Sequence, residues 1–391
     1  MKTKDIARRI KDEIYFKGIE EKELGIDLDL SNDQMKRYLS GKGDLTDLAY
    51  LRLLEHLKIS IYEVGYENPK AEKPLNNTLK YLAPSKKALE IVFKGFLYQV
   101  KTVFKKRQPG EVKKVLTNDL FFEKVSHEPF LYKYTFMSIL FLILLDYVFS
   151  NVVVLSALFS SLLIPFVMLI FLFELDRSDL SLFGVLKFFL VGGIVSLGLT
   201  HLIREVTGFT DGILGDLQTG FVEETAKLLV VLIILKRVKV KHMFTGVLIG
   251  FAVGAGFDVF ETTDYAINTL IETSGNYNEM IWTTWFRSIF AVGIGHHFWT
   301  GILAGTLVSL STSLKVAFKK LYHLGFIGMY LLIILVHASW NFNPYVLGQI
   351  LQVVFGLLFF VIFTSNAYIK MLDVSPSVES VEVAKPTEFV S

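Results

Sequence analysis

The chain has 391 residues, of which 52% are hydrophobic and 20% charged, with a formal net charge of +2 and a mean hydropathy of +0.46. It is too apolar for a water-soluble globule of this length, and its composition indicates a protein that crosses the membrane several times. Cysteine is absent from the sequence, which excludes disulfides, iron–sulfur clusters and thiolate-bound zinc, so any metal would need histidine and carboxylate ligands.

The first part of the chain is polar. Residues 1–73 carry 14 basic and 15 acidic side chains with helical spacing of apolar positions, which predicts a small soluble helical domain. Residues 74–130 form a basic, amphipathic juxtamembrane segment, suited either to the anionic cytoplasmic leaflet or to a solvated linker helix.

Residues 131–373 are expected to form an all-α membrane helix bundle. A helix rises about 1.5 Å per residue, so about 20 apolar residues cross a hydrocarbon core of about 30 Å. Eight stretches approach this length: 132–150, 152–173, 183–203, 220–235, 242–261, 281–310, 325–342 and 345–365. The remaining tail, 374–391, is rich in Ser, Val, Glu and Pro and is predicted to be disordered.

The loops predict the orientation. Lys and Arg concentrate in the connections at 236–241 and 315–320, whereas the alternate loops are poor in both. The positive-inside rule then places the N- and C-termini in the cytoplasm of a multi-pass cell-membrane protein.

Ionisable side chains interrupt the apolar stretches, where each costs at least about 2.5–3.5 kcal/mol unless it is paired or functional. The fourth stretch carries Glu223, Glu224 and Lys227. On a helix Lys227 falls between the two carboxylates, so it can neutralise one, by the favoured spacing of four, and leave the other available. A buried ion pair with a spectator glutamate would give the same pattern.

Three further stretches carry polar groups at matching depths. Glu261 ends the fifth, the adjacent histidines His296 and His297 lie inside the sixth, and His337 with Asn341 ends the seventh. Each alone could be a packing residue or an interfacial group. Together, on successive antiparallel helices, they place carboxylates and imidazoles in the outer half of the bilayer, as a water-activating hydrolytic site requires.

These elements also resemble a known family. Glu223-Glu224-x-x-Lys227, Phe257-x-x-x-Glu261, His296-x-x-x-Thr300 and His337-x-x-x-Asn341, in this order, are similar to the motifs of the PrsW family of intramembrane proteases, distant relatives of the CAAX-prenyl protease and bacteriocin-processing superfamily. The resemblance implies an intramembrane endopeptidase whose substrate is a membrane-anchored protein such as an anti-sigma factor, cut at site 1 in stress signalling.

The resemblance assigns catalytic roles to the matching positions, and the choice between His296 and His297 stays open. In one mechanism a divalent metal, most plausibly zinc, is held by four side chains while Glu223 takes the proton from water; its ligands are Glu224, Glu261, His296 and His337. In the other, Glu223 activates water without metal, and His337 with Asn341 stabilises the oxyanion.

The front domain resembles a lambda-repressor-type helix-turn-helix over residues 30–64. Its charge near −1 lacks the basic face that phosphate contacts need, which disfavours nucleic acid and favours a protein regulator as partner. Two other functions remain open: a proton- or cation-coupled transporter, because such pathways also use intramembrane carboxylates and histidines, and a membrane-tethered transcriptional regulator.

Overall fold

The structure of the protein is a computed structural model. It describes residues 105–121, 124–125, 127–149, 153–238, 240, 242–290, 292–311, 318–342 and 345–374; before residue 105 it describes 30–40 and a few single positions (10–11, 14, 24, 53, 94 and 97–98). The predicted helix-turn-helix domain therefore lies mostly outside the described residues. Within it, α3 (Asn32–Leu39) begins with a capping box between Ser31 and Gln34.

Every secondary-structure element that the structure describes in the membrane part is a helix, and the prediction of an all-α polytopic bundle is confirmed. Its elements in chain order are α7 (Pro109–Phe121), α8 (Leu131–Phe149), α9 (Val153–Leu175), α10 (Leu182–Lys187), the π-helical turn η1 (Phe188–Gly192), α11 (Gly193–Thr207), α12 (Gly212–Arg237), α13 (Met243–Glu272), α14 (Tyr277–Phe290), α15 (His296–Ser309), the 3₁₀ turn η2 (Phe318–Tyr322), α16 (Leu324–Phe342) and α17 (Val346–Val374).

Five of these helical segments are long and apolar enough to cross a membrane by length and composition: α9, the continuous run of α10, η1 and α11, α13, α16 and α17. Helix α12 carries three ionisable residues in its middle, and α14 and α15 are short. The predicted count of eight spans therefore stays a prediction.

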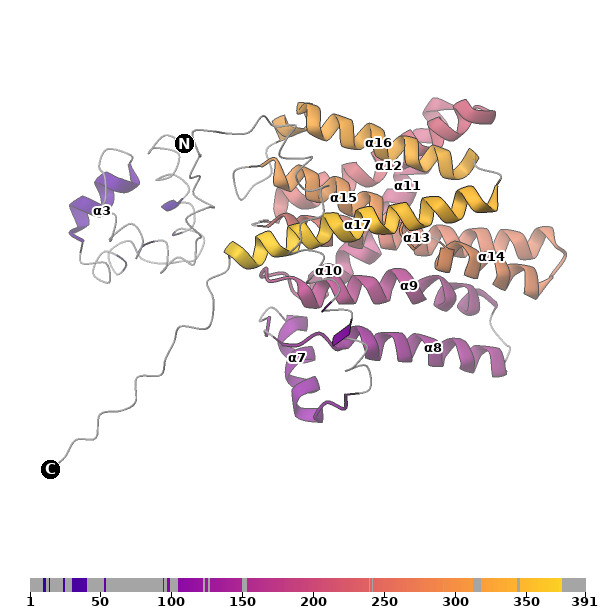
Figure 1. The fold of residues 1–391 in the computed structure, drawn as a ribbon, viewed down its shortest axis with the longest axis horizontal. Coiled ribbons are helices and arrows are strands. Elements are labelled where there is room, and N and C mark those ends of the chain that lie inside the picture. Colours follow the sequence, from indigo (N-terminus) through magenta and orange to yellow (C-terminus); the bar gives the residue numbers. More distant parts are fainter. Residues whose placement is uncertain are drawn as a thin grey trace. The chain divides into compact units, whose positions relative to one another are not determined.

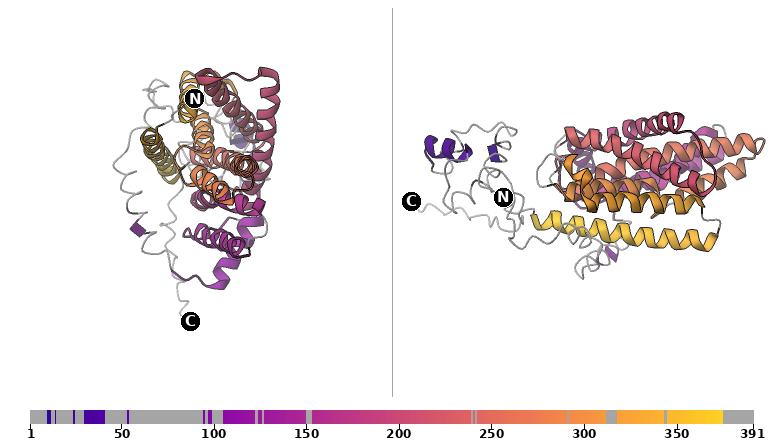
Figure 2. Two further views of the ribbon diagram at one scale, coloured as in Figure 1. Left: turned by 90° about the vertical axis from the view of Figure 1, so that its right-hand side faces the viewer. Right: turned by 90° about the horizontal axis from the view of Figure 1, so that it is seen from above.

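Helix α13 is the centre of the bundle. It packs against α9, α11, α14 and α15, and the helices run side by side around it (Figures 1 and 2). Two glycines of α13 allow α15 to approach closely: a Cβ on Gly250 would lie 2.3 Å from the Thr300 carbonyl oxygen, and one on Gly254 would lie 2.5 Å from that of His296. These contacts bring α15 against α13.

The sixth predicted stretch is not one helix. Helix α14 ends at Phe290, the chain turns through Gly293 at φ +101°, and α15 begins at His296. At about 1.5 Å per residue, each half is about 21 Å long and too short to span the bilayer. Irregular backbone at membrane depth is tolerated where protein surrounds it, and Gly293 packs against the backbone of α17 at Leu357 and Val353.

A second polar cluster joins the start of α8 to the end of α9. We call it the α8–α9 junction, and it consists of Asp119, Lys124, His127, Glu174 and Asp176. Glu174 accepts hydrogen bonds from the backbone N–H groups of Phe130, Leu131 and Tyr132, at 2.7, 2.7 and 3.1 Å. These are among the N–H groups that a helix start leaves without intrahelical partners, so Glu174 caps α8 from α9.

The rest of the junction is also paired. Lys124 donates to the Phe173 carbonyl oxygen at 2.6 Å and lies 3.7 Å from Asp176, which accepts from Thr245 of α13 at 2.7 Å. His127 Nε2 lies 3.2 Å from Glu174. The junction thus ties α7, α8, α9 and α13 together at one end of the bundle.

Candidate active site

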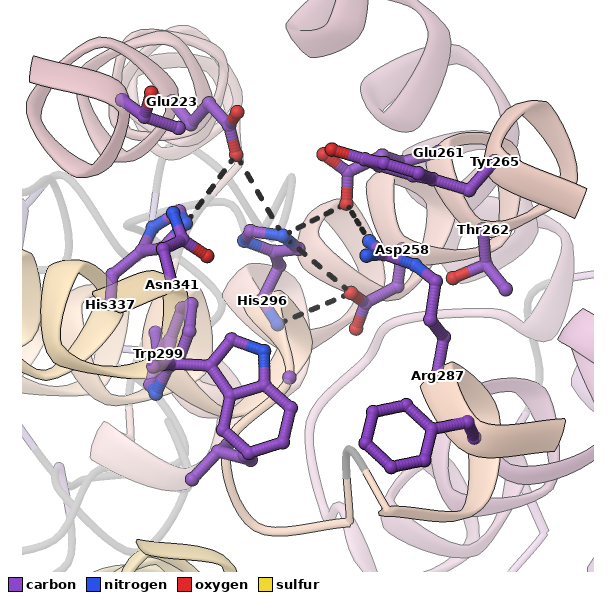
Figure 3. Close-up of a pocket in the computed structure, with 15 residues that line it drawn as sticks. Glu223, Asp258, Glu261, Thr262, Tyr265, Arg287, His296, Trp299, His337 and Asn341 are labelled. Atoms are coloured by element: carbon purple, nitrogen blue, oxygen red, sulfur yellow. Dashed lines mark hydrogen bonds and ion pairs between the residues drawn. The ribbon is translucent and has the colours of Figure 1, made fainter. Parts of the chain in front are cut away.

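Four helices bring the predicted site residues to one pocket with a cavity of about 140 Å³ (Figure 3). Glu223 comes from α12, Glu261 from α13, His296 from α15, and His337 and Asn341 from α16. The pocket is also lined by Thr219, Asp258, Thr262, Tyr265, Phe286, Arg287, Ile294, Gly295, Trp299 and Trp340. The common pocket predicted from depth and spacing is therefore present.

The two glutamates of α12 have different surroundings. Lys227 pairs with Glu224 at 2.8 Å, three residues apart, rather than with Glu223 four residues away as the spacing predicted. Glu224 and Lys227 are fully buried and lie outside the pocket lining. Glu223 faces the pocket and pairs instead with Arg204 of α11, whose Nη2 lies 2.6 Å from Oε1.

His296 and His337 stand between these two carboxylates. Their Nε2 atoms lie 3.8 and 3.7 Å from Glu223 Oε2, and their Nδ1 atoms lie 3.4 and 3.0 Å from Glu224 Oε1. Lys227 Nζ also contacts His296 Nδ1. Glu224 therefore orients both imidazoles from behind while their Nε2 atoms converge on Glu223.

Glu261 forms the other wall of the pocket. Its Oε2 lies 3.1 Å from His296 Nε2 and accepts from Arg287 Nη2 of α14 at 2.7 Å. The Arg287 guanidinium lies over the ring of Tyr265 at 3.9 Å, a cation–π contact that fixes its direction. The same guanidinium leaves its buried Nε without a hydrogen-bond partner.

The open choice between the adjacent histidines is resolved by the structure. His296 lines the pocket, whereas His297 lies outside the lining, with its ring 4.8 Å from that of Phe251 and its Nδ1 bonded to Asp258. Asn341 lies four residues after His337 on α16, and both line the pocket.

The donor atoms fit a metal ion. Glu223, His296 and His337 each offer one ligand atom, all within 4.8 Å of one another, and Asp258, Glu261 and His296 form a second such group. Glu223 Oε2 is buried and has no hydrogen-bond partner. Its distances of 3.7 and 3.8 Å to the imidazoles are close to the roughly 3.4 Å between ligand atoms around tetrahedral zinc.

The carboxylates of the site have different partners. Four carboxylates (Glu223, Glu224, Asp258 and Glu261) lie in the site; Arg204, Lys227 and Arg287 pair with three of them, and the fourth, Asp258, lies against the His297 imidazole. Glu224, which was predicted as a ligand, supplies an atom to neither of the two ligand groups.

Three contributing residues were not among the predicted ones. Arg204 lies in a predicted outer loop and Arg287 near the start of the sixth stretch. A basic residue at either place is ordinarily interpreted as a group at the membrane–water interface. Asp258 lies three residues before Glu261, and this spacing alone did not identify Asp258 as part of the site. One signal could have found the two arginines: a carboxylate inside the membrane needs a basic partner, Lys227 can serve only one of the two glutamates beside it, and the fifth stretch offers none for Glu261.

A buried centre of carboxylates and imidazoles beside a cavity, inside a polytopic helix bundle, is the arrangement that a membrane-embedded hydrolase uses. Residues 181–366, from the start of α10 into α17, match the family model described as PrsW family intramembrane metalloprotease. The protein is accordingly a peptide hydrolase of the membrane, and its family match supports a metal. No curated protein and no solved structure matches the chain significantly.

Proposed function

We propose that the protein cleaves a membrane-anchored protein near the outer face of the bilayer, and that this substrate is an anti-sigma factor released by site-1 cleavage. The observation that supports hydrolysis most directly is the convergence of His296 and His337 Nε2 on the unpaired Oε2 of Glu223. The substrate class comes from the resemblance of the motifs.

Glu223, His296 and His337 are the residues that would hold zinc. Two imidazoles and a carboxylate form a ligand set common in zinc hydrolases, and Glu224 behind both rings is the outer-shell carboxylate that such histidines need. We favour this group over Asp258, Glu261 and His296, because the Glu223 oxygen that faces the imidazoles has no hydrogen-bond partner, whereas the Glu261 oxygen that faces His296 accepts from Arg287. Bound zinc would supply Lewis acidity and an acidified water.

The other pocket residues act on the proton and the substrate. Glu261 borders the cavity opposite Glu223 and is the carboxylate placed to accept a proton from the attacking water and return it to the leaving amine. This reverses the roles that the sequence analysis gave to Glu223 and Glu261. The Asn341 amide lines the cavity and can donate to the carbonyl oxygen as charge develops there.

The two arginines hold the carboxylates in place. Arg204 binds the Glu223 oxygen that points away from the imidazoles, which leaves Oε2 directed at them. Arg287 holds Glu261 by Oε2, the same oxygen that lies 3.1 Å from His296 Nε2, and the Tyr265 ring beneath the guanidinium restricts its motion. Both guanidiniums are about one quarter exposed, so they form the outer rim of the site.

The test compares cells that carry the wild-type chain with cells that carry Glu223→Gln. Mass spectrometry of new N-termini in membrane fractions should show single-span proteins cut only in the wild type, with an anti-sigma factor among them. The purified protein in liposomes should then cut that substrate. An absence of cleavage by wild type, together with pH-driven ion flux that Glu261→Gln removes, would establish the transporter function instead.

Metal analysis is a separate test. Elemental analysis of purified wild type should give one zinc per chain, and His337→Ala should lose it. An active, chelator-insensitive protein without metal would establish the mechanism in which Glu223 itself activates water.

Two further predictions belong to this function. The N- and C-termini face the cytoplasm, and residues 1–73 bind a protein regulator rather than nucleic acid. Accessibility labelling of single cysteines, which the native chain lacks, tests the orientation without background.

A further inference from the structure

Helix α15 starts in the middle of the bundle with His296 as its first residue. Its N-cap is Gly295, which has no side chain with which to bond the free N–H groups of the first turn. Such groups cost several kcal/mol each when they are left unpaired at membrane depth. They must therefore be satisfied by another part of the protein.

Asp258 of α13 supplies that cap. Its Oδ1 accepts from the His296 N–H at 3.3 Å (Figure 3). Its Oδ2 accepts from the His297 N–H, also at 3.3 Å. A carboxylate at a helix N-terminus is also favoured by the helix dipole. The helix that carries His296 is thus attached at its first turn to the helix that carries Glu261.

His297 supports Asp258 from the side away from the pocket. Its Nδ1 bonds to Asp258 Oδ2, and its buried Nε2 has no hydrogen-bond partner. Its ring is packed against the rings of Phe251 and Phe298. A Cβ on Gly295 would lie 2.8 Å from Asp258 Oδ2 and 2.5 Å from the His297 ring, so only glycine leaves room for this arrangement.

We propose that Asp258 and His297 are a positioning pair that fixes the backbone and ring of His296, so that His296 Nε2 points into the pocket between Glu223 and Glu261. This inference rests on the proposed function, because it assigns the pair to the same site. Asp258 also lines the pocket, but the role assigned to the pair is to act through His296. Both Asp258 oxygens are occupied by the first turn of α15 and by His297, which opposes a role for Asp258 as a ligand.

The test is a double-substitution cycle on the full-length protein in detergent. Zn²⁺ affinity is measured by competition with a chelator for wild type, Asp258→Asn, His297→Leu and the double variant. Asparagine is a good N-cap, so Asp258→Asn should keep the fold, which melting of the metal-free protein checks. Asp264→Asn is the matched control, because Asp264 lies exposed on the same helix and bonds only to Asn268 among the contacts described.

Each single substitution should weaken Zn²⁺ binding by about 10–100-fold, the usual effect of losing an outer-shell partner. The double variant should be about as weak as the weaker single one, because the two residues act as a unit. The Co²⁺ absorption spectrum should change in both single variants, since the geometry of His296 is altered, whereas the control should match wild type.

Two results would overturn the proposal. If Asp258→Asn loses the metal while His297→Leu keeps wild-type affinity, Asp258 is a metal ligand. If both variants keep wild-type affinity, neither residue positions His296. If wild type binds no Zn²⁺, only the metal site of the proposed function fails. The same four proteins are then compared by their cleavage of the identified substrate. The substitutions at Asp258 and His297 should lower kcat and leave KM unchanged. An unchanged kcat would overturn the proposed positioning role.

Discussion

The site and the α8–α9 junction are both buried clusters of carboxylates, histidines and basic residues, yet their hydrogen bonds differ. In the junction, Glu174 spends both oxygens on three backbone N–H groups that need a cap. In the site, Glu223 lines the cavity and its buried Oε2 has no hydrogen bond; the junction's Asp119 Oδ2 also lacks one, but it lies 3.9 Å from the His127 ring. A cluster that closes its hydrogen bonds on the backbone holds helices together, whereas one that directs free atoms into a cavity is available for chemistry.

The largest expected effect separates the two clusters by activity. Glu223→Gln should lower the cleavage rate by at least about 10²–10⁴-fold, because it removes the charge on which the imidazoles converge. Initial rates on the identified substrate in liposomes measure this. Glu205→Gln, an exposed substitution on α11, is the matched control. Activity near wild type in Glu223→Gln would make Glu223 a structural residue like Glu174.

The second effect separates them by stability. Glu174→Ala should cost about 3 kcal/mol or more, because it leaves three backbone N–H groups and His127 without their partner. The protein that remains folded should keep its catalytic constant. Thermal unfolding in detergent gives the stability, with Glu205→Ala as control. An unchanged melting temperature would contradict the capping role.

Metal removal should give the third effect. At free zinc one hundred times its dissociation constant, binding stabilises the folded state by about 2.7 kcal/mol, so a chelator should lower the melting temperature of wild type. The same chelator should leave His337→Ala unaffected, because that variant has lost a ligand. Equal shifts in both proteins would place the metal elsewhere.

The smallest effect is a pH dependence at the junction. Burial disfavours the protonated His127 ring, but its hydrogen bonds to Glu174 and to the Val125 carbonyl, with the nearby Asp119 carboxylate, outweigh burial and raise the pKa of His127 above its usual value. Protonation of His127 therefore stabilises the fold fully below about pH 6.5, and this contribution is lost as the pH rises through the folded-state pKa.

The difference in unfolding free energy between wild type and His127→Gln isolates this contribution, because glutamine keeps a hydrogen-bonding group without the titration. The difference should be constant in acid and shrink as the medium becomes alkaline. A difference that is constant from acid to alkaline pH would show that His127 does not change its charge there.

The sequence predicted the helices and the meeting of four motifs because apolar length and ionisable residues at depth are local signals. Spacing could not predict the partner of Lys227, because Glu223 and Glu224 both lie within reach of it on the same helix. Arg204, on another helix, pairs with Glu223, and Lys227 pairs with Glu224. Likewise, Gly293 and Gly295 could have indicated a break in the sixth stretch, but the apolar residues around them favoured one continuous helix. The contact of Asp258 with α15 is tertiary and has no local signature.

Because α15 begins inside the bundle, at His296, its helix start also constrains the order in which the helices pack during synthesis. Its first turn cannot rest in hydrocarbon until Asp258 is alongside, and α13 precedes α15 in the chain, so the cap is made before the helix that needs it. We therefore expect α14 and α15 to enter the bundle only as they dock on α13, and the pocket is complete only after α16 follows with His337 and Asn341.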